Sequence, residues 1–183
     1  MTKKKLLFVL GTRPEAIKLA PLILAFQQEP KYFECTICST GQHRSLLDSA
    51  LGFFGVKPDF NLNIMQPDQS LFQLSTGILQ KMEQLLTDCN PNYVFVQGDT
   101  STAFLGALSG FYAGKTICHV EAGLRTYNKN MPFPEEVNRR MISQLADWHF
   151  APTSGARENL LQEGTPAERV ILTGNTGIDA LKL

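Results

Sequence analysis

Short apolar runs alternate with longer amphipathic stretches along most of this 183-residue chain. The runs "LLFVL" at 6–10 and "YVFV" at 93–96 are apolar without interruption, which is typical of parallel strands covered on both faces. The pattern predicts strands at Lys5–Leu10, Phe33–Thr40, Tyr93–Gln97, Thr116–Val120, Trp148–Ala151 and Val170–Thr173. It predicts helices at Pro14–Gln28, Ser45–Phe54, Leu71–Asp88, Ser101–Tyr112, Glu135–Leu145 and Ser154–Gln162.

Repeated βα units with right-handed crossovers predict an α/β fold built on a doubly wound parallel sheet. The segment "KPDFNLNIMQPDQS" fits this pattern poorly, and we interpret it as a loop with a short strand around Asn61–Met65. The final stretch, "ILTGNTGIDALKL", ends in a helix that has barely begun. We therefore expect residues 1–172 to form one domain and residues 173–183 to start a hinge to a second domain.

Composition narrows the class of protein. Seventeen basic residues balance seventeen acidic ones, so the chain has no net positive charge that would attract nucleic acid or an anionic membrane. The apolar run after Lys3–Lys5 is too short for a signal peptide, and no window is long enough for a membrane span. Cys35 and Cys38 lie three apart in a predicted strand and so point to opposite faces, which makes them buried apolar residues rather than metal ligands. These features predict a soluble, cytoplasmic protein.

Ligands of open parallel sheets bind beyond the carboxyl ends of the strands, so the residues that follow each strand are the candidates for a binding site. Residues 11–13, "GTR", follow the first strand, and Thr12 and Glu15 have the spacing of a capping box. Helix amides beside the Arg13 guanidinium predict an anion site suited to phosphate, to which Lys18 adds charge. The alternative is a structural Arg13 paired with a carboxylate. The stretch matches neither common phosphate-loop pattern, which argues against ordinary ATP and NAD sites.

Two more strand ends carry polar groups. Gln42 and His43 stand at a helix entrance after the second strand, where a solvated turn is an equally good interpretation. Asp99 follows the strand at Tyr93–Gln97, and an aspartate there has the simple alternative of capping the next helix.

Three further acids complete the candidates at this edge. Glu121 directly follows "ICHV", and a carboxylate at the rim of a buried sheet is costly without a function or a partner. Glu135 and Glu136 open a helix, where compensation of the helix dipole is a sufficient explanation. Together these positions supply cations that suit a diphosphate, and they place up to three carboxylates at the same sheet edge. Three carboxylates without a metal-binding motif indicate proton transfer.

At these residues the sequence resembles the non-hydrolysing UDP-N-acetylglucosamine 2-epimerases, through "GTRPEAIKLAPL", "QHR", "GDT", "HVEAGLRT", "PEEVNRR" and "TGNTGIDAL". The resemblance implies the N-terminal half of a GT-B two-domain architecture, with a nucleotide sugar between two Rossmann-like domains. It implies interconversion of UDP-GlcNAc and UDP-ManNAc through elimination and re-addition of UDP, with a 2-acetamidoglucal intermediate and no cofactor or metal. It also implies a homodimer, for which the apolar faces of Ser45–Phe54 and Leu71–Asp88 are candidate contacts, although both faces fit equally well against their own sheet.

Carried over residue by residue, the resemblance gives Asp99, Glu121 and Glu135 roles in proton transfer and gives Arg13 and Lys18 contacts with the nucleotide sugar. It places further substrate-binding residues at Gln42, His43, Arg125, Glu136, Asn138 and Arg139. Gln42, His43 and Glu136 are also candidates for a second, activating UDP-GlcNAc site. The family commonly has a histidine before "GDT", and this chain has Gln97, which cannot carry a proton.

The resemblance also implies that this chain alone is inactive, because a second domain supplies the rest of the site. Two other interpretations stay open. One is a domain of a GT-B glycosyltransferase or of a hydrolysing epimerase. The other is a non-catalytic module that binds a nucleotide sugar or a protein partner.

Overall fold

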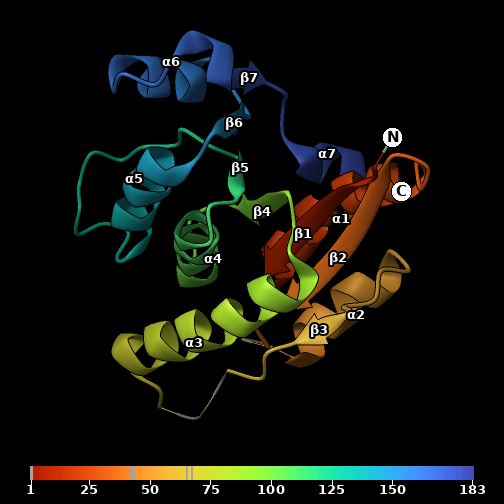
Figure 1. Cartoon of the computed structure of the whole chain (residues 1–183). Helices are drawn as coiled ribbons and strands as arrows, with labels where there is room; N and C mark the ends of the chain where they lie inside the picture. The colour runs from red at the N-terminus through yellow and green to blue at the C-terminus, as the bar shows by residue number, and fades with distance from the viewer. Residues whose placement is uncertain (1, 42–43, 65, 67) are drawn as a thin grey trace.

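A computed structural model of the chain describes residues 2–41, 44–64, 66 and 68–183. Gln42 and His43 therefore lie outside the described residues. Within these ranges, seven parallel strands form one sheet in the order β3-β2-β1-β4-β5-β6-β7 (Figure 1). The strands are β1 (Lys4–Leu10), β2 (Phe33–Ser39), β3 (Phe60–Asn61), β4 (Tyr93–Gln97), β5 (Thr116–Val120), β6 (Trp148–Ala151) and β7 (Val170–Leu172).

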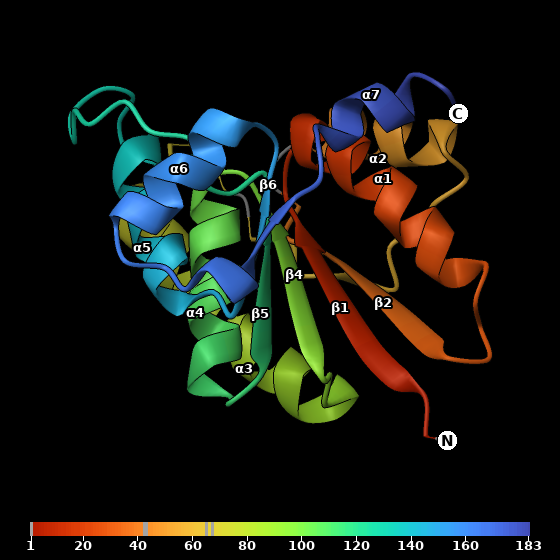
Figure 2. The same cartoon turned by 90° about the horizontal axis from the view of Figure 1, so that it is seen from above.

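Helices cover both faces of the sheet. Figure 2 shows α1, α2 and α7 on one side and α4, α5 and α6 on the other. The described helices are α1 (Arg13–Gln27), α2 (Arg44–Phe53), α3 (Leu71–Cys89), α4 (Ser101–Tyr112), α5 (Glu135–Leu145), α6 (Ser154–Gln162) and α7 (Thr176–Ala180), with a 3-10 turn at Ala167–Arg169. None of them combines the length and hydrophobicity of a membrane span.

Alternate residues of β1 enter two separate cores. Leu7 and Val9 pack with apolar residues of α3 and α4, whereas Leu6 and Phe8 pack with those of α1 and α2. All four side chains are at most 2% exposed, as expected for a parallel strand between two helical layers. The predicted α/β fold with a doubly wound parallel sheet is confirmed.

The apolar faces of α2 and α3 are used inside the chain. Leu47 and Leu51 of α2 lie in one core, and Ile78 and Met82 of α3 lie in the other. These two faces were the candidate contacts of a homodimer, and they pack against their own sheet instead. The homodimer itself stays a prediction.

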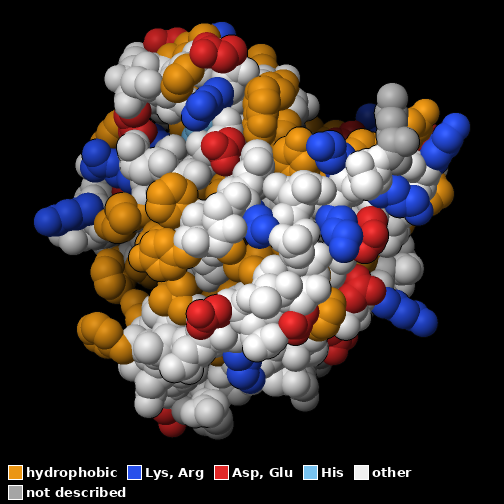
Figure 3. Space-filling model, viewed as in Figure 1, with side chains coloured by type: hydrophobic (Ala, Val, Ile, Leu, Met, Phe, Trp, Pro, Cys, Tyr) orange, Lys and Arg blue, Asp and Glu red, His pale blue; other side chains and the backbone are white. Residues whose placement is uncertain are grey.

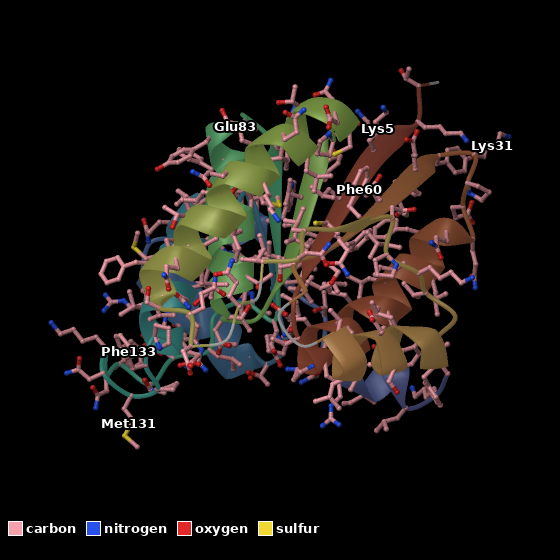
Figure 4. The ribbon with its side chains drawn as sticks, turned by 90° about the horizontal axis from the view of Figure 1, so that it is seen from below. Lys5, Lys31, Phe60, Glu83, Met131 and Phe133 are labelled. Carbon is pink, nitrogen blue, oxygen red and sulfur yellow. The ribbon has the colours of Figure 1, made fainter. Side chains whose placement is uncertain are left out.

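Exposed hydrophobic side chains gather instead over α5 and the loop before it (Figure 3). Met131 and Phe133 are 70% and 67% exposed and project outward from that loop, as Figure 4 shows. Val137 and Met141 of α5 add exposed apolar surface.

One strand differs from the sequence prediction by more than a residue at its ends, and the short helix near the end of the chain is as predicted. The short strand was expected around Asn61–Met65, and of these residues Met65 lies outside the described ones. The described strand is Phe60–Asn61, and beyond it the backbone N–H of Ile64 donates to the carbonyl of Thr40. The incipient helix near the end is α7, which packs against α1. The proposed division between residues 1–172 and 173–183 stays a prediction.

The order of the strands places a crevice at the end of β1 and β4. Strands β1, β2 and β3 succeed one another toward one edge, and β4 to β7 succeed one another toward the other edge. The succession therefore reverses between β1 and β4, and ligands of open α/β sheets bind at such a switch point. Residues 11–13, 98–100 and 121 all leave the sheet at this rim.

Candidate active site

The loop after β1 is organised around the carboxylate of Glu15, which is 1% exposed. Its Oε2 accepts hydrogen bonds from the backbone N–H groups of Gly11 at 2.8 Å and Thr12 at 2.7 Å. Its Oε1 accepts one from the hydroxyl of Thr100 at 2.6 Å. Burial raises the pKa of Glu15, while these hydrogen bonds act in the opposite direction. The backbone N–H groups of Gly11 and Thr12, which precede α1, are thus occupied by Glu15.

Gly11 lies where no side chain fits. A Cβ at this position would lie well inside contact distance of the hydroxyl oxygens of Thr40 and Thr102. Both threonines are fully buried, and their hydroxyls are 3.1 Å apart. The base of the crevice is therefore backbone and hydroxyl groups, which lets a ligand approach closely.

Arg13 is exposed and has no ion-pair partner within the described residues. The alternative interpretation, a structural arginine paired with a carboxylate, does not match this arrangement. The guanidinium stands in the first turn of α1, where the helix dipole adds positive potential. Arg13 therefore supplies an unpaired cation at the rim.

Glu121 lies directly after β5 and is held by donors from three other segments. Lys18 Nζ contacts both of its carboxylate oxygens at 2.6 Å. Gln97 Nε2 donates to Oε2, and Asn175 Nδ2 donates to Oε1 at 3.3 Å. Its backbone has a φ of 63°, a region that non-glycine residues rarely adopt. The partner that this rim carboxylate requires is Lys18.

Asp99 is fixed through both its side chain and its backbone. Its Oδ2 forms an ion pair with Arg139 at 2.6 Å, and its carbonyl accepts a hydrogen bond from Asn138 Nδ2 at 2.8 Å. Asp99 does not cap α4, because Thr100 is the N-cap and its hydroxyl accepts from the N–H of Ala103. The carboxylate remains 25% exposed and faces the rim with one partner.

The loop that carries Asp99 adjoins Glu121. The N–H of Gly98 donates to the carbonyl of Val120, and a Cβ at Gly98 would lie 3.7 Å from Glu121 Oε2. His119 Nε2 donates to the carbonyl of Gly98 at 2.7 Å. Burial lowers the pKa of His119 to about 3, so the ring is neutral at ordinary pH and acts as a fixed donor. Asp99 and Glu121 are thus neighbours at the ends of adjacent strands.

The two acids that open α5 have different surroundings. Glu135 is half-buried and has no hydrogen-bond partner among the described residues. Glu136 is fully buried and accepts from the N–H groups of Thr126 and Tyr127, each at 3.0 Å, and from Arg139. Burial alone would raise the pKa of Glu136, but these hydrogen bonds outweigh it and the pKa lies below its usual value. Glu136 holds the loop before α5.

Arg125 is a structural residue, because its guanidinium forms an ion pair with Glu163. Its side chain is fully buried, and it makes two hydrogen bonds to the carboxylate of Glu163, at 2.8 and 2.7 Å. It also donates to the hydroxyl of Ser143 and the carbonyl of Leu124. The contacts with Ser143 and Glu163 tie the loop after β5 to α5 and to the end of α6. Its predicted contact with substrate gains no support from this geometry.

Comparison with known proteins identifies the family. A family model described as UDP-N-acetylglucosamine 2-epimerase matches residues 25–183. The chain belongs to the UDP-N-acetylglucosamine 2-epimerase family. The UDP-N-acetylglucosamine 2-epimerase of Salmonella borreze is 50% identical over 177 residues, which are 97% of this chain and 47% of that protein. The chain thus spans about half the length of the curated relatives it matches.

Solved structures agree with this assignment. The UDP-GlcNAc 2-epimerase from Neisseria meningitidis bound to UDP-GlcNAc is 49% identical, with a TM-score of 0.92 over 99% of this chain and 49% of that chain. The structure of S. aureus MnaA with UDP is 50% identical, with a TM-score of 0.92 over 100% of this chain and 47% of that chain. A lipopolysaccharide outer core galactosyltransferase at 15% identity, with a TM-score of 0.64 over 95% of this chain, shares the fold alone. The fold is therefore half of a GT-B-like structure.

For this epimerase-family chain, the structure brings most of the predicted residues to one rim. Those that lie there are Arg13, Lys18, Asp99, Glu121, Asn138 and Arg139. Glu135 is the first residue of α5, the helix that also carries Asn138 and Arg139. Arg125 and Glu136 are engaged in structural contacts. Sequence reasoning gave no site role to Glu15, Thr100, His119 or Asn175, although all four lie within quoted motifs. The capping-box spacing of Thr12 and Glu15 predicts the contacts of Glu15 with its own helix start. It does not predict the hydrogen bond with Thr100.

Other features lie apart from this rim. A hollow of about 670 Å³ lies between α3 and α4 and includes Leu79, Glu83 and Tyr112. Tyr112 ends α4, whereas the rim is at the start of that helix, so we do not place a substrate there.

Cys38 is buried in one core and Cys35 packs against the other, as predicted for opposite faces of a strand. Among the described residues, no group of three His, Cys, Asp or Glu is arranged to hold a metal.

Proposed function

We propose that this chain is the N-terminal half of a non-hydrolysing epimerase that interconverts UDP-GlcNAc and UDP-ManNAc by inversion at C2. The observation that carries the proposal is the juxtaposition of Asp99 and Glu121 at the ends of neighbouring strands, on the rim that also presents Arg13. A relative that is 49% identical binds UDP-GlcNAc, which supports a UDP-linked sugar as the ligand of this family's site.

The chemistry explains why such a site needs acids and cations. The C2 hydrogen of an N-acetyl sugar is not adjacent to a carbonyl, so its direct removal would leave an unstabilised carbanion. In an elimination, a base takes the C2 proton, the electron pair forms a C1–C2 double bond, and the bond from C1 to the diphosphate oxygen breaks. UDP then adds back at C1 while a proton is delivered to the opposite face of C2. No hydride moves, so the reaction requires no nicotinamide.

The rim residues have matching capabilities. Arg13 is an unpaired cation that is suited to the negative charge of the departing diphosphate. Asp99 and Glu121 lie on adjacent strand ends and are candidates for the base and the acid, with Glu135 as the third carboxylate. Arg139 and Lys18 orient the first two of these through ion pairs. Asn138 holds the backbone of Asp99, which makes it a positioning residue in this proposal.

Several parts of the proposal concern more than this chain. We propose that turnover requires the other half of the protein, because this chain contributes only one side of the crevice. A homodimer, a cytoplasmic location and a second, activating UDP-GlcNAc site at Gln42, His43 and Glu136 stay predictions.

The proposal is tested with the full-length protein and UDP-GlcNAc in D2O, followed by NMR. Conversion to UDP-ManNAc with deuterium at C2 is the expected result. Release of free ManNAc would identify a hydrolase, and a strict requirement for an acceptor would identify a transferase. Binding without turnover would identify a non-catalytic module.

A pair of variants ties the reaction to the rim. Asp99→Asn should reduce turnover by about two to four orders of magnitude, the usual contribution of a positioned acid or base. Asp88→Asn changes an exposed carboxylate on α3 and should leave turnover unchanged. Equal activity of the two variants would return Asp99 to a structural role.

A further inference from the structure

We propose that Glu15 and Thr100 form a positioning link that sets the distance between two loops of the site. We call residues 11–13 the anion loop and residues 98–100 the acid loop. The link is the hydrogen bond from the Thr100 hydroxyl to Glu15 Oε1, at 2.6 Å between residues 85 positions apart in sequence. This inference rests on the proposed function, since it assigns those loops to the diphosphate and to proton transfer.

The sheet does not hold these two loops together by itself. Strands β1 and β4 pair only as far as Phe8 and Phe95, although they end at Leu10 and Gln97. In contrast, β1 stays paired with β2 to its last residue, and β4 stays paired with β5 to its last residue. The sheet therefore separates at the switch point, and each loop follows a different neighbour. The Glu15–Thr100 hydrogen bond spans that separation.

Glu15 anchors the anion loop on its other oxygen. Oε2 accepts from the N–H groups of Gly11 and Thr12 and from the Thr12 hydroxyl at 2.9 Å. A capping-box glutamate needs only the local contact with its own helix start. Here the second oxygen is directed to a different strand end, and the carboxylate is 1% exposed. A buried carboxylate with four donors has little freedom to move.

Thr100 anchors the acid loop in the same way. Its hydroxyl oxygen accepts the N–H of Ala103 at the start of α4, so its single proton is available for Glu15. The chain of donors runs from Ala103 through Thr100 to Glu15. Asp99 precedes Thr100 directly, so the position of its carboxylate depends on this loop.

The link predicts a specific kinetic effect. In the full-length enzyme, Thr100→Val should lower kcat about 10–100-fold, because a shift of the acid loop misplaces the proton-transfer groups. KM should stay within about threefold, because Glu15 still holds the anion loop. Thr100→Ser keeps the hydroxyl and should restore kcat. Thr153→Val is the matched control: it removes the threonine N-cap of α6, whose hydroxyl accepts from Ala156, and should leave both constants unchanged.

Two results would overturn the link. One is an unchanged kcat for Thr100→Val, and the other is an equal fall in kcat for Thr153→Val, which would reduce the effect to a lost helix cap.

A second measurement separates the link from the proposed function. Glu15→Gln should increase amide hydrogen exchange at Ala103 in the 183-residue chain, because Thr100 loses its charged acceptor. Unchanged exchange at Ala103 would refute the link even in an active enzyme. If the wild-type full-length protein fails to epimerise, the proposed function fails, and the exchange result still decides whether the link exists.

Discussion

Two buried histidines should make this fold sensitive to acid. His119 of β5 and His149 of β6 are opposite each other in the sheet register, and each is 1% exposed. Burial lowers the pKa of His119 to about 3 and that of His149 to about 4. The nearby Arg125 lowers both pKa values further, whereas Asp147 acts against it at His149. Both rings are therefore neutral in the folded chain at any pH above about 4.

The size of the effect follows from the two pKa values. Below the unfolded value of 6.5, the unfolded chain binds a proton at each histidine and the folded chain does not. The free energy of unfolding therefore falls as pH decreases, by about 1.4 kcal/mol per pH unit for each histidine. At about pH 5 the loss is about 2 kcal/mol per histidine and about 4 kcal/mol for both, out of a typical total of about 5–15 kcal/mol.

Urea unfolding of the 183-residue chain at about pH 7.5 and about pH 5 measures this effect. His149→Gln should lower the stability at both pH values, but its loss between them should be about 2 kcal/mol smaller than that of the wild type. His119→Gln should behave in the same way. Carboxylates titrate equally in wild type and variants, so the difference isolates the histidines. The same pH dependence in all three proteins would refute the reasoning.

Three further changes test the rim and its supports. Glu121→Gln in the full-length protein should reduce turnover by about two to four orders of magnitude, measured by NMR, with little change in stability; near-normal turnover would exclude it as acid or base. Arg13→Ala should weaken UDP-GlcNAc binding about 10–100-fold by calorimetry, as expected for a lost charged contact, and unaltered affinity would remove Arg13 from the site. Arg125→Met should lower the free energy of unfolding by about 3 kcal/mol, because Glu163 loses a partner with which it makes two hydrogen bonds; an unchanged urea midpoint would contradict this.

The helices and strands were predictable because their signals are local. The bounds of α4 (Ser101–Tyr112) and α5 (Glu135–Leu145) match the predicted ones, since caps and apolar periodicity lie within the segments themselves. The carboxyl-end rule also located the rim correctly, because it depends only on parallel strands. In contrast, β3 consists of Phe60–Asn61 alone, too short for a period-2 pattern to define.

The connections within the site were not predictable from local patterns. Lys18 was expected to contact the nucleotide sugar, and nothing in its local pattern indicated its contact with a carboxylate 103 positions away in the chain. Arg125 lies in a motif of the family but pairs with Glu163, the C-cap residue of α6. Which acid meets which cation depends on side-chain directions after the sheet has formed. Periodicity and caps contain no information about that choice.

Position 11 illustrates how little change the centre of this fold allows. Even alanine would bring a methyl group against the Thr40 and Thr102 hydroxyls, and those side chains belong to different segments on either side of β1. Accommodating the methyl group would require these two buried side chains, or the segments that carry them, to shift, and Thr102 lies in the first turn of the helix that begins beside Asp99. A residue with no side chain of its own thereby restricts the spacing of its neighbours, and a side chain at position 11 would alter the surroundings of Asp99.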